Sequence, residues 1–129
     1  MHYVDTSALV KLVVTERETP ALHEWLAETG AELVSCDLTR TELIRAVRRV
    51  AADRVVQARQ VLDAVTLINP STATYDNAAL LEPQILRTLD ALHLASALEL
   101  GDDLSGLITY DTRMAEAASA LGLAVVAPG

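Results

Sequence analysis

The chain of 129 residues carries a formal net charge of −8, and apolar residues account for 51% of it. A chain of this length folds as one domain with a buried core, so we expect a single domain over residues 1–129, and the apolar content excludes a disordered protein. The acidic charge disfavours generic nucleic-acid binding, whereas the single cysteine and the lack of an apolar run of membrane-spanning length predict a cytoplasmic protein with no membrane association.

The first part of the chain alternates between strand-like and helix-like segments. A short strand is predicted at residues 2–5, followed by a helix over about 6–13. A second helix is predicted from the Thr-Pro pair at 19–20, because proline suits the first helical turn, to the glycine at 30. Residues 32–36 then predict another strand.

The rest of the chain continues the alternation. Two arginine-bearing helices are expected, beginning near 38–41 and near Asp53. The remaining strands are predicted at 65–68, 106–110 and 123–126, and the remaining helices at 73–81, 88–100 and 112–121. Strands that alternate with helices are typical of an α/β domain, so we expect a central parallel sheet of about five strands flanked by helices.

Four acidic residues stand where a strand is expected to end and a helix to begin, namely Asp5, Glu42, Asp90 and Asp111. In an open parallel sheet such junctions lie along one edge, where ligands bind. Carboxylates brought close together repel one another and require a divalent cation. Oxygen ligands without Cys/His clusters favour Mg²⁺ or Mn²⁺ over Zn²⁺.

Each acid also has a purely structural interpretation. Asp5 and Asp111 can cap the helices that follow them, and Glu42 has the capping-box spacing from Thr39. Asp90 would lie in a first helical turn, where the helix dipole favours negative charge. The apolar helix that follows Asp90 nevertheless predicts a buried carboxylate, which is costly unless it is paired or bound to metal.

A local basic block interrupts this acidic protein. Six of the ten basic residues fall within residues 40–59: Arg40, Arg45, Arg48, Arg49, Arg54 and Arg59. At helical spacing, Arg45 and Arg49 share a stripe with Glu42, which suggests guanidiniums that hold RNA phosphates beside a metal. The alternatives are a solvated helix face and an intrahelical ion pair between Glu42 and Arg45.

Other polar residues lie beside the acids. Thr6, Ser7 and Thr109 place hydroxyls that can orient a carboxylate or a metal-bound water, or that can simply cap a helix. His93 shares a helix face with Asp90 and can reach the site, although a hydrogen-bonded core histidine is the commoner case.

Four segments, VDTSALVKL, TRTELIRAVRR, LRTLDALHLASALELG and LITYDTRMAEAASALGL, resemble the PIN-domain ribonucleases. The likeness is closest to the VapC-type toxins of type II toxin–antitoxin pairs and runs from Met1 to the last strand. It implies a PIN fold, Mg²⁺- or Mn²⁺-dependent endoribonuclease activity on RNA, a homodimer, and inhibition by a cognate antitoxin. It places the catalytic metal ligands on the four acids and accessory hydroxyls on the three residues above.

One departure and two other functions bear on this resemblance. Some relatives carry a further acid two or three residues after the fourth one, where this chain has Arg113 and Met114, so a second metal site is not expected to be complete. A receiver domain is disfavoured, since Asp5 lacks a neighbouring acid and Lys11 is the only lysine. A non-catalytic PIN-like module that binds RNA or protein stays open, because four retained acids do not prove turnover.

Overall fold

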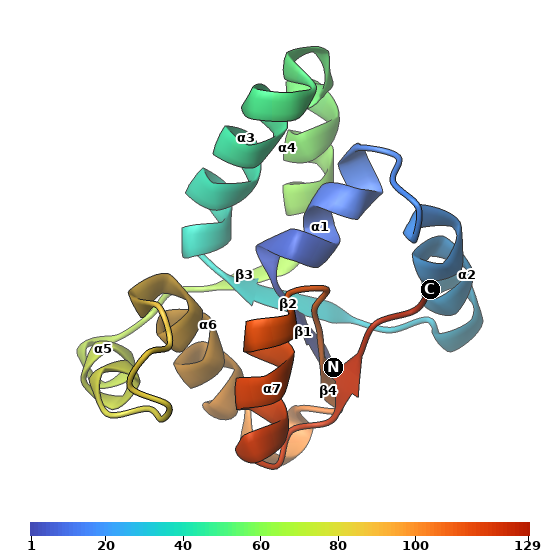
Figure 1. The fold of residues 1–129 in the computed structure, drawn as a ribbon. Coiled ribbons are helices and arrows are strands. Elements are labelled where there is room, and N and C mark those ends of the chain that lie inside the picture. The colour runs from blue at the N-terminus through green and yellow to red at the C-terminus, as the bar shows by residue number, and fades with distance from the viewer.

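A five-stranded sheet runs through the centre of the computed structural model, which describes all residues from 1 to 129 (Figure 1). All neighbouring strands are parallel, in the spatial order β3-β2-β1-β4-β5. The strands are β1 (His2–Val4), β2 (Leu33–Cys36), β3 (Thr66–Ile68), β4 (Gly106–Ile108) and β5 (Val125–Val126). The predicted α/β architecture is confirmed.

Seven α-helices flank the sheet, in two groups. They are α1 (Thr6–Val13), α2 (Thr19–Thr29), α3 (Leu38–Val50), α4 (Val55–Asp63), α5 (Thr72–Ala79), α6 (Thr88–Leu98) and α7 (Thr112–Ala120). Helices α1 to α4 share an apolar core with Val4 and Ile108, while α6 and α7 share a second core with Tyr3 and Leu107, and α5 packs against α6. Successive strand residues point to opposite faces, so β1 and β4 hold both cores together.

The chain changes direction across the sheet between β1 and β4. From β1 it proceeds outward to β2 and β3, and then α5 and α6 return it to β4 on the other side of β1 (Figure 1). Ligands of open α/β sheets bind beyond the carboxyl ends of the strands at such a switch point. Asp5 follows directly on β1 and Thr109 on β4, so the topology places both residues there.

All the predicted elements exist, but several boundaries were wrong. The strands predicted at 2–5, 32–36, 65–68, 106–110 and 123–126 are each one or two residues shorter, and the helices predicted at 73–81, 88–100 and 112–121 are Thr72–Ala79, Thr88–Leu98 and Thr112–Ala120. Asp5 and Thr109 lie just beyond the ends of β1 and β4, where the Asp5 side chain caps α1 and accepts the hydroxyl of Thr109. Asp53 lies in a short 3-10 turn before α4. No helix has both the length and the apolar character needed to cross a bilayer.

Candidate active site

Asp5 lies at the start of α1, where it caps the helix and also faces β4. Its Oδ1 accepts the N–H of Ala8 at 3.1 Å and the hydroxyl of Ser7 at 2.6 Å, while its Oδ2 accepts the hydroxyl of Thr109. The residue is only 4% exposed. Burial raises the pKa of the Asp5 carboxyl, although the three hydrogen bonds oppose that shift. One oxygen therefore serves the fold and the other faces the neighbouring strand.

At the start of α7, the two carboxylate oxygens of Asp111 also have different partners. Its Oδ1 accepts two N–H groups of the first turn of that helix, at 2.9 and 3.1 Å, and its Oδ2 accepts from Arg87 at 3.2 Å. Its backbone N–H donates to Oγ1 of Thr109 at 3.1 Å, and Thr109 donates in turn to Asp5. One threonine thus connects the acid after β1 to the acid after β4.

Glu42 reaches the site from the second turn of α3. The Thr6 hydroxyl donates to its Oε1 at 3.1 Å, and Nε2 of His93 lies 2.5 Å from the same oxygen. Both structural interpretations of Glu42 are wrong. Thr39 forms no capping box, because its buried hydroxyl is bonded to a serine of β2. Glu42 also makes no ion pair with Arg45.

His93 is buried, with 2% exposure, and both of its ring nitrogens have polar partners. Nδ1 lies 2.7 Å from the Tyr3 hydroxyl and 3.7 Å from Sγ of Cys36, while Nε2 meets Glu42. Burial opposes a charge on the ring, but the hydrogen bonds with Cys36 and Glu42 outweigh it and raise the pKa of His93 to about 10. His93 is therefore a core residue that also holds a site carboxylate in place.

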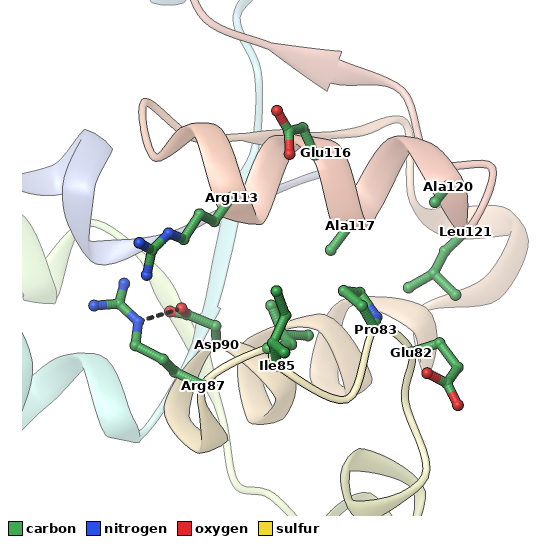
Figure 2. Close-up of a pocket in the computed structure, with 11 residues that line it drawn as sticks. Glu82, Pro83, Ile85, Arg87, Asp90, Arg113, Glu116, Ala117, Ala120 and Leu121 are labelled. Carbon is green, nitrogen blue, oxygen red and sulfur yellow. Dashed lines mark hydrogen bonds and ion pairs between the residues drawn. The ribbon is translucent and has the colours of Figure 1, made fainter.

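Asp90 lies at the edge of the core rather than inside it. Its side chain is 15% exposed, and burial begins with the next residue of α6. Arg87, which immediately precedes α6, donates to Asp90 Oδ2 from Nε at 3.0 Å, as Figure 2 shows, and reaches Asp111 with Nη2. The sequence predicted a buried Asp90 that is paired or bound to metal, and the structure places it at 15% exposure in an ion pair with Arg87.

These contacts connect Asp5, Asp111 and Asp90 through Thr109 and Arg87, while Glu42 belongs to a second hydrogen-bonded cluster with Thr6 and His93. No three Asp, Glu, His or Cys side chains are grouped around one position as ligands of an ion. The donors are nevertheless carboxylate oxygens, which Mg²⁺ and Mn²⁺ prefer, and the carboxylates of Asp90 and Asp111 already share one cationic group, the Arg87 guanidinium. The donor chemistry fits a hard divalent cation, although this arrangement does not preform a coordination sphere.

Arg45 and Arg49 lie with Arg48 around a hollow on the surface of α3. The hollow measures about 260 Å³ and is lined by these three arginines alone. None of them forms an ion pair. The sequence analysis missed Arg48 because helical spacing from Glu42 selects only the other two. Three unpaired guanidiniums on the helix that carries Glu42 suit the binding of phosphates.

A groove of about 720 Å³ opens beside Asp90, between α7 and the loop that leads into α6 (Figure 2). Ile85 and Ala117 contribute apolar surface, and the side chains of Arg87 and Arg113 reach toward the end of the groove where Asp90 lies. The acid site is therefore open on this side to a ligand with both apolar and anionic parts.

The sequence model of the PIN domain family matches residues 2–120. The chain belongs to the PIN-domain family. Ribonuclease VapC46 of Mycobacterium tuberculosis is 44% identical to it over 98% of this chain and 96% of that protein. Ribonuclease VapC35 of the same organism is 44% identical over 100% of this chain and 98% of that protein.

Solved structures agree on the PIN fold. The crystal structure of M. tuberculosis VapC20, described as a sarcin–ricin loop cleaving toxin, superposes with a TM-score of 0.80 at 16% identity, covering 99% of this chain and 100% of that one. A toxin–antitoxin complex from Klebsiella pneumoniae gives 0.69 at 24% identity, covering 88% of each chain. At these identities the likeness concerns the fold alone.

Within this PIN domain, hydrogen bonds link Asp5, Asp90 and Asp111 with Ser7 and Thr109, while Glu42 is bonded to Thr6 and His93. Sequence reasoning missed Arg87 altogether and treated the two roles of His93 as alternatives. The available indication for Arg87 was its spacing of three residues before Asp90 on a helix, which permits an ion pair. Its second contact, with Asp111, depends on how α6 and α7 approach each other and has no local sequence signature.

Proposed function

We propose that residues 1–129 form one PIN domain that acts as a metal-dependent endoribonuclease. In this proposal the protein is the toxin of a toxin–antitoxin pair and acts in the cytoplasm, where both its RNA substrate and its antitoxin are present. The observation that carries this proposal is the hydrogen-bonded network of Asp5, Asp111 and Asp90 at the switch point of the sheet, with Glu42 bonded to Thr6, the residue that follows Asp5 in the chain. The likeness to ribonucleases VapC46 and VapC35 over nearly the whole chain supports it.

Asp5, Glu42, Asp90 and Asp111 would hold Mg²⁺ or Mn²⁺ in this enzyme. A bound cation of this kind supplies Lewis acidity toward a phosphodiester oxygen and lowers the pKa of bound water. The protein supplies the positions of the ligands. Ser7 and Thr109 fix the Asp5 carboxylate, and Thr6 and His93 fix that of Glu42, because each hydrogen bond removes a rotational choice from the acid.

The direct test is cleavage of a panel of purified cellular RNAs, tRNAs included, with the ends of the products mapped. We expect defined internal cuts with Mg²⁺ or Mn²⁺, loss of cutting in EDTA, and recovery when the cation is restored in excess. Cutting that persists in EDTA would contradict the metal dependence. RNA binding without cutting in any cation would instead favour the non-catalytic module.

The partners of the proposed toxin are its RNA substrate, a cognate antitoxin and a second copy of the chain. Toxin–antitoxin complexes among the structural neighbours support the antitoxin. A small DNA-binding protein encoded beside this chain is the first antitoxin to test, by its inhibition of RNA cleavage. Light scattering on the purified chain tests the homodimer.

The three arginines of α3 give a prediction about RNA affinity. If Arg45 and Arg49 contact phosphates, changing both to glutamate should weaken RNA binding by about 10-fold or more and reduce the slope of log K against log salt, because fewer counterions are released. Arg59→Glu is the control, since Arg59 is exposed on α4 and does not line the hollow. Unchanged affinity and salt slope in the double variant would show that these residues are only solvated surface. Binding is measured without antitoxin.

A further inference from the structure

Arg87 joins two of the four acids across the site. Its Nε donates to Oδ2 of Asp90 at 3.0 Å and its Nη2 to Oδ2 of Asp111 at 3.2 Å. The two acids belong to the first turn of α6 and to the start of α7, so no helix-capping or helix-dipole effect explains a residue that contacts both. The guanidinium instead provides the countercharge that neighbouring carboxylates need when no metal is bound.

The Arg87 side chain is far more exposed than the acids it contacts. It is 60% exposed, against 15% for Asp90 and 28% for Asp111. An ion pair with so exposed a partner is weak, because water screens it and a long side chain must be ordered. Asp111 is also bonded to the first turn of α7 and Asp90 is largely buried, whereas the exposed arginine can leave, so a divalent cation, with twice the charge, can displace it.

The displaced guanidinium would lie in a groove that can receive an anionic ligand. Figure 2 shows Arg87 and Arg113 extending from the start of α6 and from α7 toward the same end of the groove beside Asp90. Arg113 has no acidic partner, so this end of the groove carries uncompensated positive charge once Asp90 and Asp111 are taken up by a cation. A planar guanidinium pairs with phosphate as well as with carboxylate.

We propose that Arg87 exchanges partners during function. It neutralises Asp90 and Asp111 in the metal-free protein, and it binds a phosphate of the RNA backbone when a divalent cation occupies the acids. The metal site and the substrate site are thereby coupled through one side chain, so metal binding frees a phosphate ligand that is otherwise held by the protein itself. This inference rests on the proposed function and adds a substrate-binding residue to it.

The first part of the proposal, that Arg87 neutralises Asp90 and Asp111 in the metal-free protein, is tested without RNA. The measurement is a calorimetric titration of the metal-free protein with Mn²⁺. Arg87→Ala removes the competing cation, so we expect it to bind Mn²⁺ roughly 3- to 10-fold more tightly than the wild type and to melt at a lower temperature in EDTA. Arg113→Ala is the matched control, because it removes a guanidinium from the same groove but not from an ion pair, and its Mn²⁺ affinity should stay within about 2-fold of wild type. Arg87→Ala with wild-type Mn²⁺ affinity would overturn the proposal.

The second part of the proposal, that Arg87 binds an RNA phosphate when metal is present, is tested by fluorescence anisotropy with a short single-stranded RNA. The Asp5→Asn variant is used as the background because it prevents cleavage of that RNA. Binding is compared in EDTA and at the Mn²⁺ concentration that saturates this background in the same titration. We expect Mn²⁺ to strengthen RNA binding when Arg87 is present, and Arg87→Ala to weaken RNA binding in Mn²⁺ by roughly 3- to 10-fold. Equal RNA affinity in Mn²⁺ with and without Arg87 would reject the exchange of partners.

The two failures are distinguishable. If no form of the protein binds or cuts RNA, the proposed function is wrong, while the Mn²⁺ titration still decides whether Arg87 is the counter-ion of the acids. If the wild type cuts RNA and Arg87→Ala changes neither Mn²⁺ nor RNA affinity, this inference alone is wrong.

Discussion

An Asp5→Asn protein is expected to fold normally and to cut RNA at least about 100-fold more slowly than the wild type, because changing a residue that merely supports a metal ligand already costs about 10- to 100-fold. Asparagine keeps one side-chain oxygen for the N–H of Ala8 and the hydroxyl of Ser7. The Thr109 hydroxyl can rotate to accept from the new amide. The change that remains is the loss of one negative charge from the site. Initial cleavage rates in saturating Mg²⁺ or Mn²⁺, with a melting curve, measure both expectations.

Asp37→Asn is the matched control for this experiment. Asp37 also follows a strand at the same edge of the sheet and precedes a helix, but it pairs only with the exposed Arg40 and makes no side-chain cap. It should cut RNA at the wild-type rate. Wild-type cutting by Asp5→Asn would remove Asp5 from the catalytic site, and equal losses in both variants would indicate an effect of overall charge.

His93→Leu is expected to have the second-largest effect, on stability and on activity together. Leucine fills much of the space but leaves the buried Tyr3 hydroxyl without its partner, and leaves Glu42 with the Thr6 hydroxyl as its one remaining donor. An unsatisfied buried polar group costs about 1–3 kcal/mol, so we expect a loss of roughly 2–3 kcal/mol in the free energy of unfolding. Cleavage should fall by about 10- to 100-fold, as is typical when the partner of a metal ligand is removed. Denaturant unfolding and cleavage rates at saturating metal are the measurements.

Two variants separate lost stability from lost positioning. Ser96→Ala lies one turn further along α6 and removes only a buried bond to the carbonyl of Leu92, so its cutting should stay close to wild type. His93→Gln keeps a donor for Glu42 and should recover part of the activity that His93→Leu loses. If all three variants cut equally well, Glu42 does not depend on His93 for its position.

The sequence predicted the architecture because the relevant information is local. Alternation of strand and helix segments follows from apolar periodicity, and the glycine at 30, where the backbone is left-handed with φ 59°, ends α2 as expected. Strand ends were predicted less well. β4 ends at Ile108, and the hydroxyl of the next residue, Thr109, bonds across to Asp5, a contact between residues far apart in the chain.

The residues of the site likewise fall into those that the sequence could locate and those whose contacts it could not predict. Asp5 and Asp111 could be located because they stand at strand-to-helix junctions, as expected. Glu42 and Asp90 lie instead within the opening turns of α3 and α6, so the expectation of a junction was wrong for these two. The contacts of His93 and Arg87 could not be predicted, since each joins residues on different elements. The expectation of four mutually repelling carboxylates was also incomplete, because Arg87 neutralises two of them and His93 pairs with a third.

One carboxylate oxygen of Asp5 and one of Asp111 cap the helices that follow them, and this affects how the protein folds. Each of these acids begins a helix, so the positive dipole ends of α1 and α7 converge on the acidic site. A helix terminus contributes about 0.3–1 kcal/mol to a carboxylate beside it. Together with Arg87, the backbone therefore provides countercharge as the helices form. We expect a newly synthesised chain to fold fully at a low concentration of free metal. The folded protein would then remain inactive until it binds its cation.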